Sequence, residues 1–308
     1  MSSLDTLPDL ISVDQPLEAL TTYKLGGPAR WYAEPGDIDE LSAVLTVWRT
    51  TEVPLVVLGR GSNVLVADAG FDGLVIRPIG RFAEIVVATS GTVTAGCAAP
   101  LPRLARAAVK EGRAGLEFFV GIPGSVGGAV RMNAGCHGSE TKEWLVAARV
   151  IDVGTGELTE RDPAGLDLSY RHSNLRDAEI VVAAHFRTVP GSAAAGERLM
   201  REIGRWRKEH QPGGTLNAGS VFKNPPGDSA GRIIDEAGLK GFAIGGAVIS
   251  TRHANFIEAG PGASAGDVYE LIRQTRERVA GACGVTLDPE VRFVGDFEES
   301  AHRRGAGH

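Results

Sequence analysis

The stretch Leu55-Val-Val-Leu-Gly-Arg-Gly-Ser-Asn-Val-Leu-Val66 joins two short apolar runs through a glycine-rich loop. The run before the loop, Leu55 to Leu58, is typical of a buried strand, and Val64 to Val66 after the loop again predicts strand. Glycine has no Cβ, so backbone N–H groups in such a loop can converge on a phosphate. A Rossmann dinucleotide turn would need a third glycine and a following helix, so this stretch argues against a Rossmann fold.

A second glycine-rich loop lies in the middle of the chain, where Gly121-Ile-Pro-Gly-Ser-Val-Gly-Gly128 precedes Asn133-Ala-Gly135. Pro123 sits inside this loop, so it too departs from the Rossmann fingerprint, and neither loop has the Gly-Lys-Ser/Thr of a P-loop. Either loop alone is as compatible with a tight turn as with a ligand. Two such loops with small polar neighbours favour one shared pyrophosphate ligand. The polar neighbours are Ser62, Asn63, Ser125 and Asn133.

The rest of the chain mixes helical and strand patterns without heptads or a fixed-period repeat, which predicts an α+β fold. Asp37 is a candidate N-cap for the first helix, Pro212 ends the third, and Pro190 to Gly196 predicts a connector. The expected helical faces are Ile38, Leu41, Leu45 and Trp48; Leu101, Leu104, Ala105 and Ala108; Leu199, Ile203 and Trp206; and Val268, Leu271, Ile272, Thr275 and Val279. The expected strands are Leu74–Arg77, Glu84–Ala88, Thr92–Ala95, Ala147–Val153, Glu179–Val189 and Val291–Val294.

Composition narrows the functional class. The 308 residues include 41 glycines, carry a formal net charge of −6 and are 43% apolar, which describes a globular chain. A nucleic-acid-binding protein would usually show a basic stripe, so the charge argues against that class. Cys97, Cys136 and Cys283 are odd in number and form no C-x-x-C motif, which suits a reducing cytosol.

The sequence shows neither a targeting segment nor a metal motif. The first residues lack the basic and apolar regions of a signal peptide, and no apolar run of about 18 residues follows. We therefore expect a cytoplasmic protein with no membrane or nucleic-acid partner. The seven histidines have no H-x-H or H-E-x-x-H spacing, so no protein-ligated metal is expected.

Polar residues gather among small and apolar ones in the last third. Ser220 stands beside Ala218 and Gly219, which leave its hydroxyl unobstructed, but no G-x-S-x-G elbow is present. A proton donor or a hydrogen-bonding serine is thus favoured over a hydrolase nucleophile, and a turn or cap serine stays open. The cluster comprises Lys208, Asn217, Ser220, Lys223, Asn224, Glu236, His253, Asn255 and Glu290.

Arg171 lies between two predicted strands, in Ser169-Tyr-Arg-His-Ser173. Its guanidinium is a natural fork for a carboxylate, and a surface salt bridge is the ordinary alternative. Glu290 follows Pro289 at the start of a predicted strand, where an exposed carboxylate is the default interpretation.

Seven of these segments, in this order, resemble the UDP-N-acetylenolpyruvoylglucosamine reductases, flavoenzymes of bacterial peptidoglycan synthesis. The resemblance runs from about residue 20 to 297. The segments are Thr22-Tyr-Lys-Leu-Gly-Gly-Pro28, Gly59-Arg-Gly-Ser-Asn-Val-Leu65, Gly121-Ile-Pro-Gly-Ser-Val-Gly-Gly128, Asn133-Ala-Gly135, Ser169-Tyr-Arg171, Ala218-Gly-Ser-Val-Phe-Lys-Asn-Pro225 and Pro289-Glu-Val-Arg-Phe293.

The resemblance implies an FAD-binding domain of the vanillyl-alcohol-oxidase type in two subdomains, 1–85 and 86–195. A smaller α+β substrate domain over 196–304 and a tail over 305–308 would follow. The first loop contains no His or Cys for covalent attachment, so non-covalent FAD is expected. The implied FAD-binding residues are Gly59, Arg60, Gly61, Ser62, Asn63, Gly121, Ile122, Pro123, Gly124, Ser125, Gly127, Gly128, Asn133, Ala134 and Gly135.

The resemblance also implies the chemistry. NADPH would reduce FAD, and hydride would pass from flavin N5 to the enolpyruvyl methylene of UDP-N-acetylglucosamine enolpyruvate, giving UDP-N-acetylmuramate. Arg171 and Glu290 would flank the substrate carboxylate, where negative charge develops. Glu290 can help only when protonated or sharing a proton, because a bare carboxylate would repel that charge. Ser220 would then protonate the adjacent carbon.

Substrate binding is implied for Tyr170, Lys208, Lys223, Asn224 and His253, with Lys208 and Asn224 at the UDP phosphates. Some family members carry an insertion whose tyrosine covers the uridine. The connector from Arg187 to Arg201 is short and has no Tyr, so this chain resembles the shorter subtype. A monomer is expected.

Two other functions remain to be weighed. An oxidase on the same FAD fold would keep the glycine loops and pass electrons to oxygen, without needing Ser220, Arg171 and Glu290 together. A non-catalytic UDP-sugar-binding module would bind no flavin and would be colourless when purified.

Overall fold

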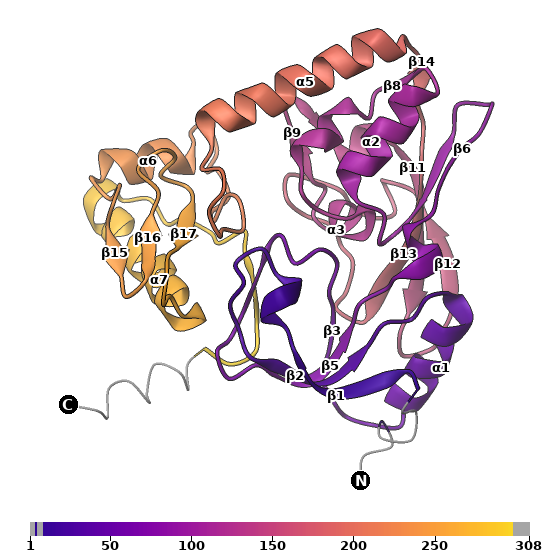
Figure 1. Ribbon diagram of the computed structural model, residues 1–308, viewed down its shortest axis with the longest axis horizontal. Helices are drawn as coiled ribbons and strands as arrows, with labels where there is room; N and C mark the ends of the chain where they lie inside the picture. The colour runs from indigo at the N-terminus through magenta and orange to yellow at the C-terminus, as the bar shows by residue number, and fades with distance from the viewer. Residues whose placement is uncertain (1–3, 5–8, 298–308) are drawn as a thin grey trace. The chain divides into compact units, whose positions relative to one another are not determined.

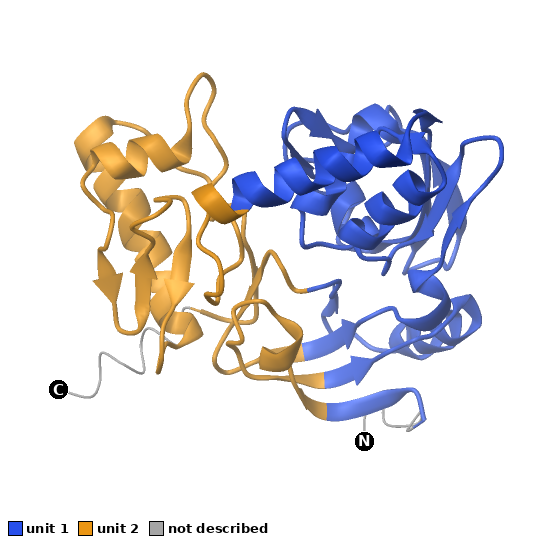
Figure 2. Cartoon of the chain, turned by 45° about the horizontal axis from the view of Figure 1, so that its top comes forward, with its two compact units in different colours: residues 1–13, 31–60, 73–207 blue, residues 14–30, 61–72, 208–308 orange. Residues whose placement is uncertain are grey.

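The computed structural model describes Leu4 and residues 9–297 (Figure 1). These residues form two compact units, which Figure 2 shows in different colours. Unit 1 holds the described residues of Met1–Val13, Trp31–Arg60 and Gly73–Arg207, and unit 2 holds those of Asp14–Arg30, Gly61–Asp72 and Lys208–His308. The chain therefore passes between the units five times, once inside the first glycine loop.

A four-stranded sheet begins unit 1, in the order β1-β2-β5-β3, with β3 and β5 parallel. Helix α1 (Ile38–Trp48) starts as predicted after Asp37, whose carboxylate accepts the N–H groups of Asp39 and Glu40 at 3.0 Å each. The strands are β1 (Ile11–Pro16), β2 (Pro28–Ala33), β3 (Leu55–Val57) and β5 (Phe71–Ile76).

A five-stranded antiparallel sheet forms the rest of unit 1, in the order β12-β11-β13-β7-β6. Helix α3 (Val126–Arg131) packs on β13, and the predicted face of α2 (Leu101–Lys110) is fully buried. The strands are β6 (Ile85–Val87), β7 (Val93–Gly96), β11 (Leu145–Asp152), β12 (Leu158–Arg161) and β13 (Glu179–Phe186). Shorter elements are η3 (Gly80–Ala83), β8 (Arg113–Ala114), η4 (Glu117–Gly121), β9 (Gly135–Cys136), β10 (Ser139–Glu140), α4 (Thr141–Trp144) and β14 (Val189–Pro190).

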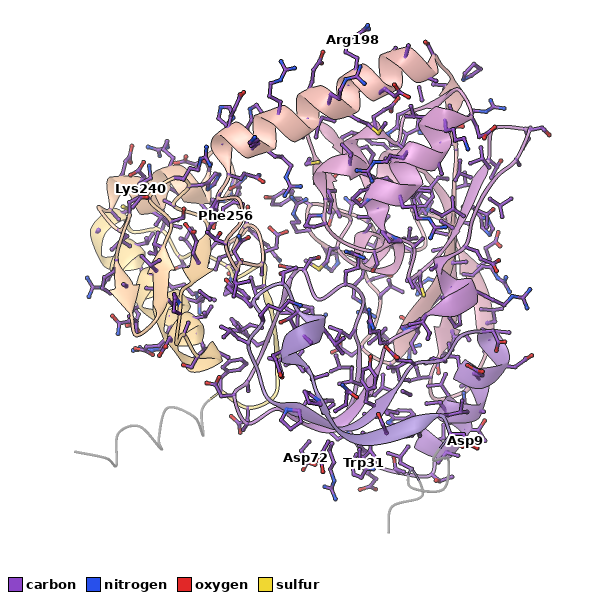
Figure 3. All side chains as sticks on the ribbon, in the orientation of Figure 1. Asp9, Trp31, Asp72, Arg198, Lys240 and Phe256 are labelled. Atoms are coloured by element: carbon purple, nitrogen blue, oxygen red, sulfur yellow. The ribbon has the colours of Figure 1, made fainter. Side chains whose placement is uncertain are left out.

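The connector predicted over Pro190–Gly196 is wrong in its second half, because helix α5 already begins at Ala193 and runs to His210. Three consecutive alanines favour helix. Gly196 is buried in this helix, and it packs so closely on Val109 that a Cβ would lie 2.8 Å from the Val109 side chain. Of the predicted stripe only Ile203 is buried, while Arg198 projects from the outer face of α5 (Figure 3).

Unit 2 is built from the segments around residues 14–30 and 61–72 together with the last third of the chain, which share one hydrophobic core. Strand β4 (Val64–Val66) pairs in parallel with β18 (Arg292–Val294). Helix α7 (Ala265–Cys283) buries its predicted face and is capped by Ser264, while Asp68 accepts the Ala265 N–H at 2.8 Å. The remaining elements are η2 (Glu18–Leu20), α6 (Ala230–Glu236), β15 (Ala243–Ile244), β16 (Ala247–Ile249) and β17 (Ile257–Ala259).

The predicted α+β class is confirmed by these sheets and helices. The predicted boundary at 195/196 falls within α5, and the division at 85/86 stays a prediction. The tail predicted at 305–308 lies outside the described residues. Among the described residues, no helix has both the length and the apolar character needed to cross a membrane.

Candidate active site

A cavity of about 280 Å³ in unit 1 brings the two glycine loops together. Gly59 and Arg60 of the first loop line it, as do Ser125, Gly127 and Gly128 of the second. The remaining lining comes from β3, the segment after β5, the segment after β7, α2, α3 and β13. Those lining residues are Val57, Arg77, Pro78, Ile79, Gly80, Ala83, Cys97, Ala98, Pro100, Arg103, Arg131, Glu179, Ile180 and Val181.

The two loops approach so closely that a side chain at position 59 has no room. A Cβ on Gly59 would lie 2.5 Å from the Ser125 hydroxyl oxygen. Nearby, the Arg60 Nε donates to the Pro123 carbonyl oxygen at 3.3 Å. Ser125 is the N-cap residue of α3, yet its side chain makes no capping hydrogen bond. The glycine at 59 thus permits the contact that closes this side of the cavity.

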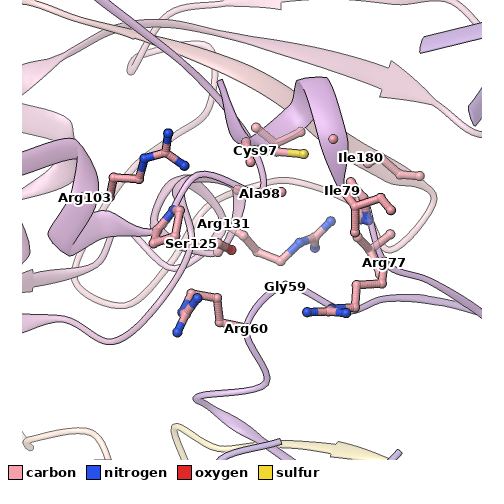
Figure 4. Close-up of a pocket in the computed structure, with 18 of the residues that line it drawn as sticks. Gly59, Arg60, Arg77, Ile79, Cys97, Ala98, Arg103, Ser125, Arg131 and Ile180 are labelled. Atoms are coloured by element: carbon pink, nitrogen blue, oxygen red, sulfur yellow. The ribbon is translucent and has the colours of Figure 1, made fainter. Parts of the chain in front are cut away.

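The cavity is strongly cationic. Four arginines and one glutamate line it, which gives a net charge of +4 − 1 = +3 (Figure 4). Although burial alone would raise the pKa of Glu179, hydrogen bonds from the Arg176 backbone and side chain, and the Arg161 charge, lower it. Glu179 therefore stays ionised, held by Arg161 at 3.2 Å and Arg176 at 3.1 Å. The net positive charge suits a dianionic pyrophosphate such as that of FAD.

Arg131 is fixed within this lining rather than loosely placed. Its guanidinium donates to the carbonyl oxygens of Leu175, Arg176 and Glu179, at 3.3, 3.0 and 2.7 Å. These bonds hold the segment before β13 against α3. The cavity thus meets the demands of the flavin's phosphates, namely narrow glycine walls and oriented cations.

The other ten predicted FAD-binding residues do not line the cavity. Gly61, Ser62 and Asn63 belong to unit 2, where Thr22 donates its N–H to the Gly61 carbonyl at 3.0 Å. Those in unit 1 are Gly121, Ile122, Pro123, Gly124, Asn133, Ala134 and Gly135.

Asn133 is fully buried with φ +40°, and its amide is committed to other protein groups. The Nδ2 donates to Glu140 Oε2 at 2.8 Å and to the Ser169 carbonyl at 3.0 Å, and the Oδ1 accepts the Lys142 N–H at 2.9 Å. The Gly135 carbonyl accepts a hydrogen bond from the Arg171 Nη2 at 3.1 Å. This segment therefore supports the loop that carries Arg171.

Arg171 has φ +53°, a left-handed conformation that few non-glycine residues adopt and that is enriched at functional sites. Its guanidinium lies 5.0 Å from the centre of the Tyr170 ring, which limits its orientation. Burial raises the pKa of the Cys136 thiol to about 11, against the opposing charges of Arg207 and Arg171. Two guanidinium groups therefore lie near this one thiol.

Arg207 is a candidate that the sequence analysis missed. It is half-buried at the end of α5, and this burial lowers its pKa. Burial and the Arg207 charge also lower the pKa of His137, whose ring meets the Trp206 ring edge-on at 5.0 Å. In the sequence, Arg207 is one of several arginines on an amphipathic helix, and no local pattern singles it out.

Unit 2 brings Ser220 and Glu290 into adjacent, paired segments. The Glu290 N–H donates to the Val221 carbonyl at 2.7 Å, and the Lys223 N–H donates to the Asp288 carbonyl at 2.9 Å. Ser220 immediately precedes Val221, so the backbones of Ser220 and Glu290 lie side by side although 70 residues separate them. Both side chains are partly exposed.

Of the predicted substrate-binding residues, Tyr170 lies in unit 1 and the others lie in unit 2. Asn224 Oδ1 accepts the Ala230 N–H at 3.0 Å at the start of α6. Gly231 of the same helix packs against the His253 ring, to which a Cβ at position 231 would come within 3.1 Å. Burial lowers the pKa of His253, and Lys240 adds to this effect. Lys223 belongs to the segment paired with Asp288, and Lys208 is exposed at the end of α5.

Among residues 4 and 9–297, no three His, Cys, Asp or Glu side chains gather as a metal site.

Comparison with known proteins decides the family. The family model of an FAD-binding domain matches residues 29–161, and that of the UDP-N-acetylenolpyruvoylglucosamine reductase C-terminal domain matches residues 211–294. A UDP-N-acetylenolpyruvoylglucosamine reductase of Heliobacterium modesticaldum is 44% identical over 301 residues, covering 94% of this chain and 95% of the relative. The chain belongs to the UDP-N-acetylenolpyruvoylglucosamine reductase family. A second relative so named, from Synechococcus sp. (strain JA-3-3Ab), is 41% identical and covers 97% of this chain and 96% of its own.

A crystal structure of the reductase from Thermus caldophilus is also similar, with a TM-score of 0.79 and 38% identity over 92% of this chain and 98% of that chain. The present chain is thus an FAD-dependent oxidoreductase with an FAD-binding domain followed by a family-specific C-terminal domain. The predicted family, fold class, enzyme class and FAD cofactor are confirmed. The roles of individual residues stay predictions.

Proposed function

We propose that this reductase converts UDP-N-acetylglucosamine enolpyruvate into UDP-N-acetylmuramate, using NADPH, in the cytoplasm and as an early step of peptidoglycan synthesis. The observation that carries the proposal is the pairing of the Ser220 and Glu290 segments in a chain of this family. These are two residues that the family resemblance assigns to the reacting end of the substrate.

The cationic cavity is the proposed site of the FAD pyrophosphate. Gly59 and Gly127 keep its walls narrow, and Arg60 and Arg103 add positive charge beside the anchored Arg131. Bound FAD supplies the hydride that the reaction needs. The first glycine loop contains no His or Cys for a covalent link to the flavin, so we expect the cofactor to leave the protein on acid denaturation.

Arg171 is the proposed partner of the substrate carboxylate. Hydride would add to the terminal methylene carbon of the enolpyruvyl group, where its electron pair forms the new C–H bond. The π electrons of the double bond would then become negative charge at the adjacent carbon, shared with that carboxylate. A guanidinium held by the Gly135 carbonyl and the Tyr170 ring is already oriented for this charge, so little reorganisation is needed. Arg207 adds a second cation to the same part of unit 1.

Ser220 is the proposed proton donor to the carbon that bears the ether oxygen. The proton leaves the Ser220 hydroxyl, forms the new C–H bond and is restored from solvent. Glu290, protonated or sharing a proton, would stabilise the same charged group from the neighbouring segment. Hydride at one carbon and a proton at the next together saturate the double bond, which balances the reaction.

Substrate binding is assigned to Tyr170, Lys208, Lys223, Asn224 and His253, with Lys208 and Asn224 at the UDP phosphates. Asn224 uses its Oδ1 at the start of α6, which orients the amide so that its NH₂ can donate to a phosphate. Lysine ammonium groups supply the opposite charge that a diphosphate requires. We further propose that the enzyme acts as a monomer.

The proposal is tested with Ser220→Ala under anaerobic conditions. The variant should still bleach its flavin on addition of NADPH, because Ser220 takes no part in that step. Reoxidation by the enolpyruvyl sugar should slow by about 10²- to 10⁴-fold, the usual contribution of a positioned proton donor. Reoxidation within a few-fold of wild type would show that Ser220 is not the donor.

A further inference from the structure

Asn255 is a buried polar side chain that holds the backbone just after Ser220. It is 3% exposed, and both ends of its amide bond to the backbone of Phe222. The Oδ1 accepts the Phe222 N–H at 2.9 Å, and the Nδ2 donates to the Phe222 carbonyl at 2.8 Å. Its own carbonyl accepts the Val221 N–H at 2.9 Å. Asn255 thus pairs with the two residues after Ser220 as a strand partner would.

The opposite side of this pairing is fixed independently. Glu290 donates its N–H to the Val221 carbonyl at 2.7 Å, and its own carbonyl accepts the Asn63 Nδ2 at 2.9 Å. The Asn63 carbonyl in turn accepts the Arg292 N–H at 3.0 Å, next to the β4–β18 pairing. Glu290 is therefore anchored to β4 without help from Asn255.

We propose that Asn255 is a positioning residue for Ser220, setting its place relative to Glu290; this inference rests on the proposed function. Asn255 itself would touch neither carbon of the enolpyruvyl double bond. It acts through Phe222 and Val221, which follow Ser220 directly in the chain. When the Asn255 side chain is truncated, Phe222 loses both hydrogen bonds to the amide, which loosens the Ser220 segment on that side, while Glu290 keeps its bonds to Val221 and Asn63.

The amide chemistry explains why this position needs asparagine. The side chain must accept from one backbone group and donate to another at the same time, which a carboxylate cannot do. In Asn255→Asp, an ionised carboxylate would face the Phe222 carbonyl, and both groups are acceptors. Burial raises the pKa of such an acid, and its protonated form restores a donor. The defect should therefore diminish as the pH falls.

The test measures both half-reactions of the holoenzyme by anaerobic stopped-flow spectroscopy, for wild type, Asn255→Ala, Asn255→Asp and Thr275→Val. Thr275 is the matched control, because it is buried in the same unit and its hydroxyl bonds only to the Leu271 carbonyl within α7. Thermal unfolding of each variant records the accompanying loss of stability. Enolpyruvyl UDP-sugar concentration is varied, so that the limiting rate and the apparent KM are separated.

We expect flavin reduction by NADPH within about twofold of wild type in all variants, since Ser220 is not used there. The limiting rate of reoxidation should fall about 10- to 100-fold in both Asn255 variants, the effect of misplacing a catalytic group by roughly 1 Å. Relative to wild type, Asn255→Asp should regain activity between pH 8 and pH 5.5. Thr275→Val should keep both half-reactions.

Four results would overturn the inference. Asn255 variants that reoxidise within a few-fold of wild type would show that Ser220 does not depend on this clamp. A Thr275→Val variant that loses as much activity for the same loss of stability would assign the effect to general destabilisation, as would an Asn255→Asp defect without pH dependence. If wild type itself is not reoxidised by the enolpyruvyl sugar, the proposed function fails and the inference fails with it.

Discussion

The close approach of the two glycine loops gives a sharp prediction for Gly59→Ala. Its new Cβ would lie 2.5 Å from the Ser125 hydroxyl oxygen, whereas ordinary contacts begin at 3.4 Å. The atoms must therefore separate by 3.4 − 2.5 = 0.9 Å. Ser125 is 3% exposed and lines the cavity, so either its hydroxyl turns into that space or the two loops move apart, and both changes reach the site proposed for FAD.

The magnitude follows from the cost of overpacking, about 1–3 kcal/mol for one extra methyl group in a packed site. That cost should divide between a lower free energy of unfolding and weaker FAD binding, because FAD requires the loops at their original separation. If the whole overpacking cost appeared in cofactor binding, the FAD Kd would rise by about 5- to 150-fold.

Ser125→Ala supplies the matched partner for a double-mutant cycle. It removes the hydroxyl and leaves the Ser125 Cβ, which lies at 3.6 Å from the new methyl group, an ordinary contact. Gly59→Ala should therefore cost little in the Ser125→Ala background, with a coupling energy of at least about 1 kcal/mol. Urea unfolding and fluorescence titration of the apoprotein with FAD measure the two quantities. Additive effects of the two substitutions would refute the steric argument, and an unchanged FAD Kd with lost stability would separate the loop contact from cofactor binding.

Three further predictions concern individual side chains. Arg171→Gln should leave NADPH-dependent flavin reduction intact and slow reoxidation by the enolpyruvyl sugar by about 10²- to 10³-fold, since it removes a preoriented donor to developing charge; equal loss in both half-reactions would contradict that role. Iodoacetamide at pH 7.5 should modify exposed Cys283 well before Cys136, because burial raises the pKa of the Cys136 thiol to about 11, and peptide mass spectrometry would show otherwise if Cys136 reacted first. Burial lowers the pKa of His253 from its ordinary 6.5, so below about that pH the unfolded chain takes up the proton first and the free energy of unfolding falls. His253→Gln should weaken this fall between pH 7.5 and 5.5 in urea unfolding, and an identical slope in both proteins would count against it.

The elements that the sequence predicted well are those specified by local chemistry. The carboxylate of Asp37 caps α1 at its predicted start, and the apolar residues of α7 recur at the spacing of one buried face. Each of these signals comes from residues that are only a few positions apart in the sequence. No knowledge of the rest of the fold is therefore needed to use it.

The errors arise where distant segments decide the outcome. Gly196 was interpreted as part of a connector, yet it lies inside α5, where close packing against Val109 leaves no room for a side chain. The Asn63 amide donates to the Glu290 carbonyl, 227 residues away, a contact that the composition of its loop does not indicate, and its role at the flavin stays a prediction. Neither partner can be identified without knowing which strands pair.

The cavity shows the same limit. The sequence indicated the two glycine loops, but Arg77, Arg103 and Arg131 lie on three other segments and have no motif of their own. These arginines are ordinary in sequence. Their positive charges meet in one cavity only because β5, α2 and α3 pack around the same space. Arg207 was missed for the same reason, because its neighbour Cys136 is 71 residues earlier in the chain.

The central claim is that electrons pass from NADPH through the flavin to an enolpyruvyl UDP-sugar. The most direct test is the visible spectrum of the purified protein, recorded without oxygen during successive additions of NADPH and UDP-N-acetylglucosamine enolpyruvate. The account predicts a yellow protein that bleaches with NADPH and regains its colour on adding the enolpyruvyl sugar. Colour that returns only when air is admitted would contradict it and indicate an oxidase, and a colourless protein that binds no added FAD would contradict the flavoenzyme assignment itself.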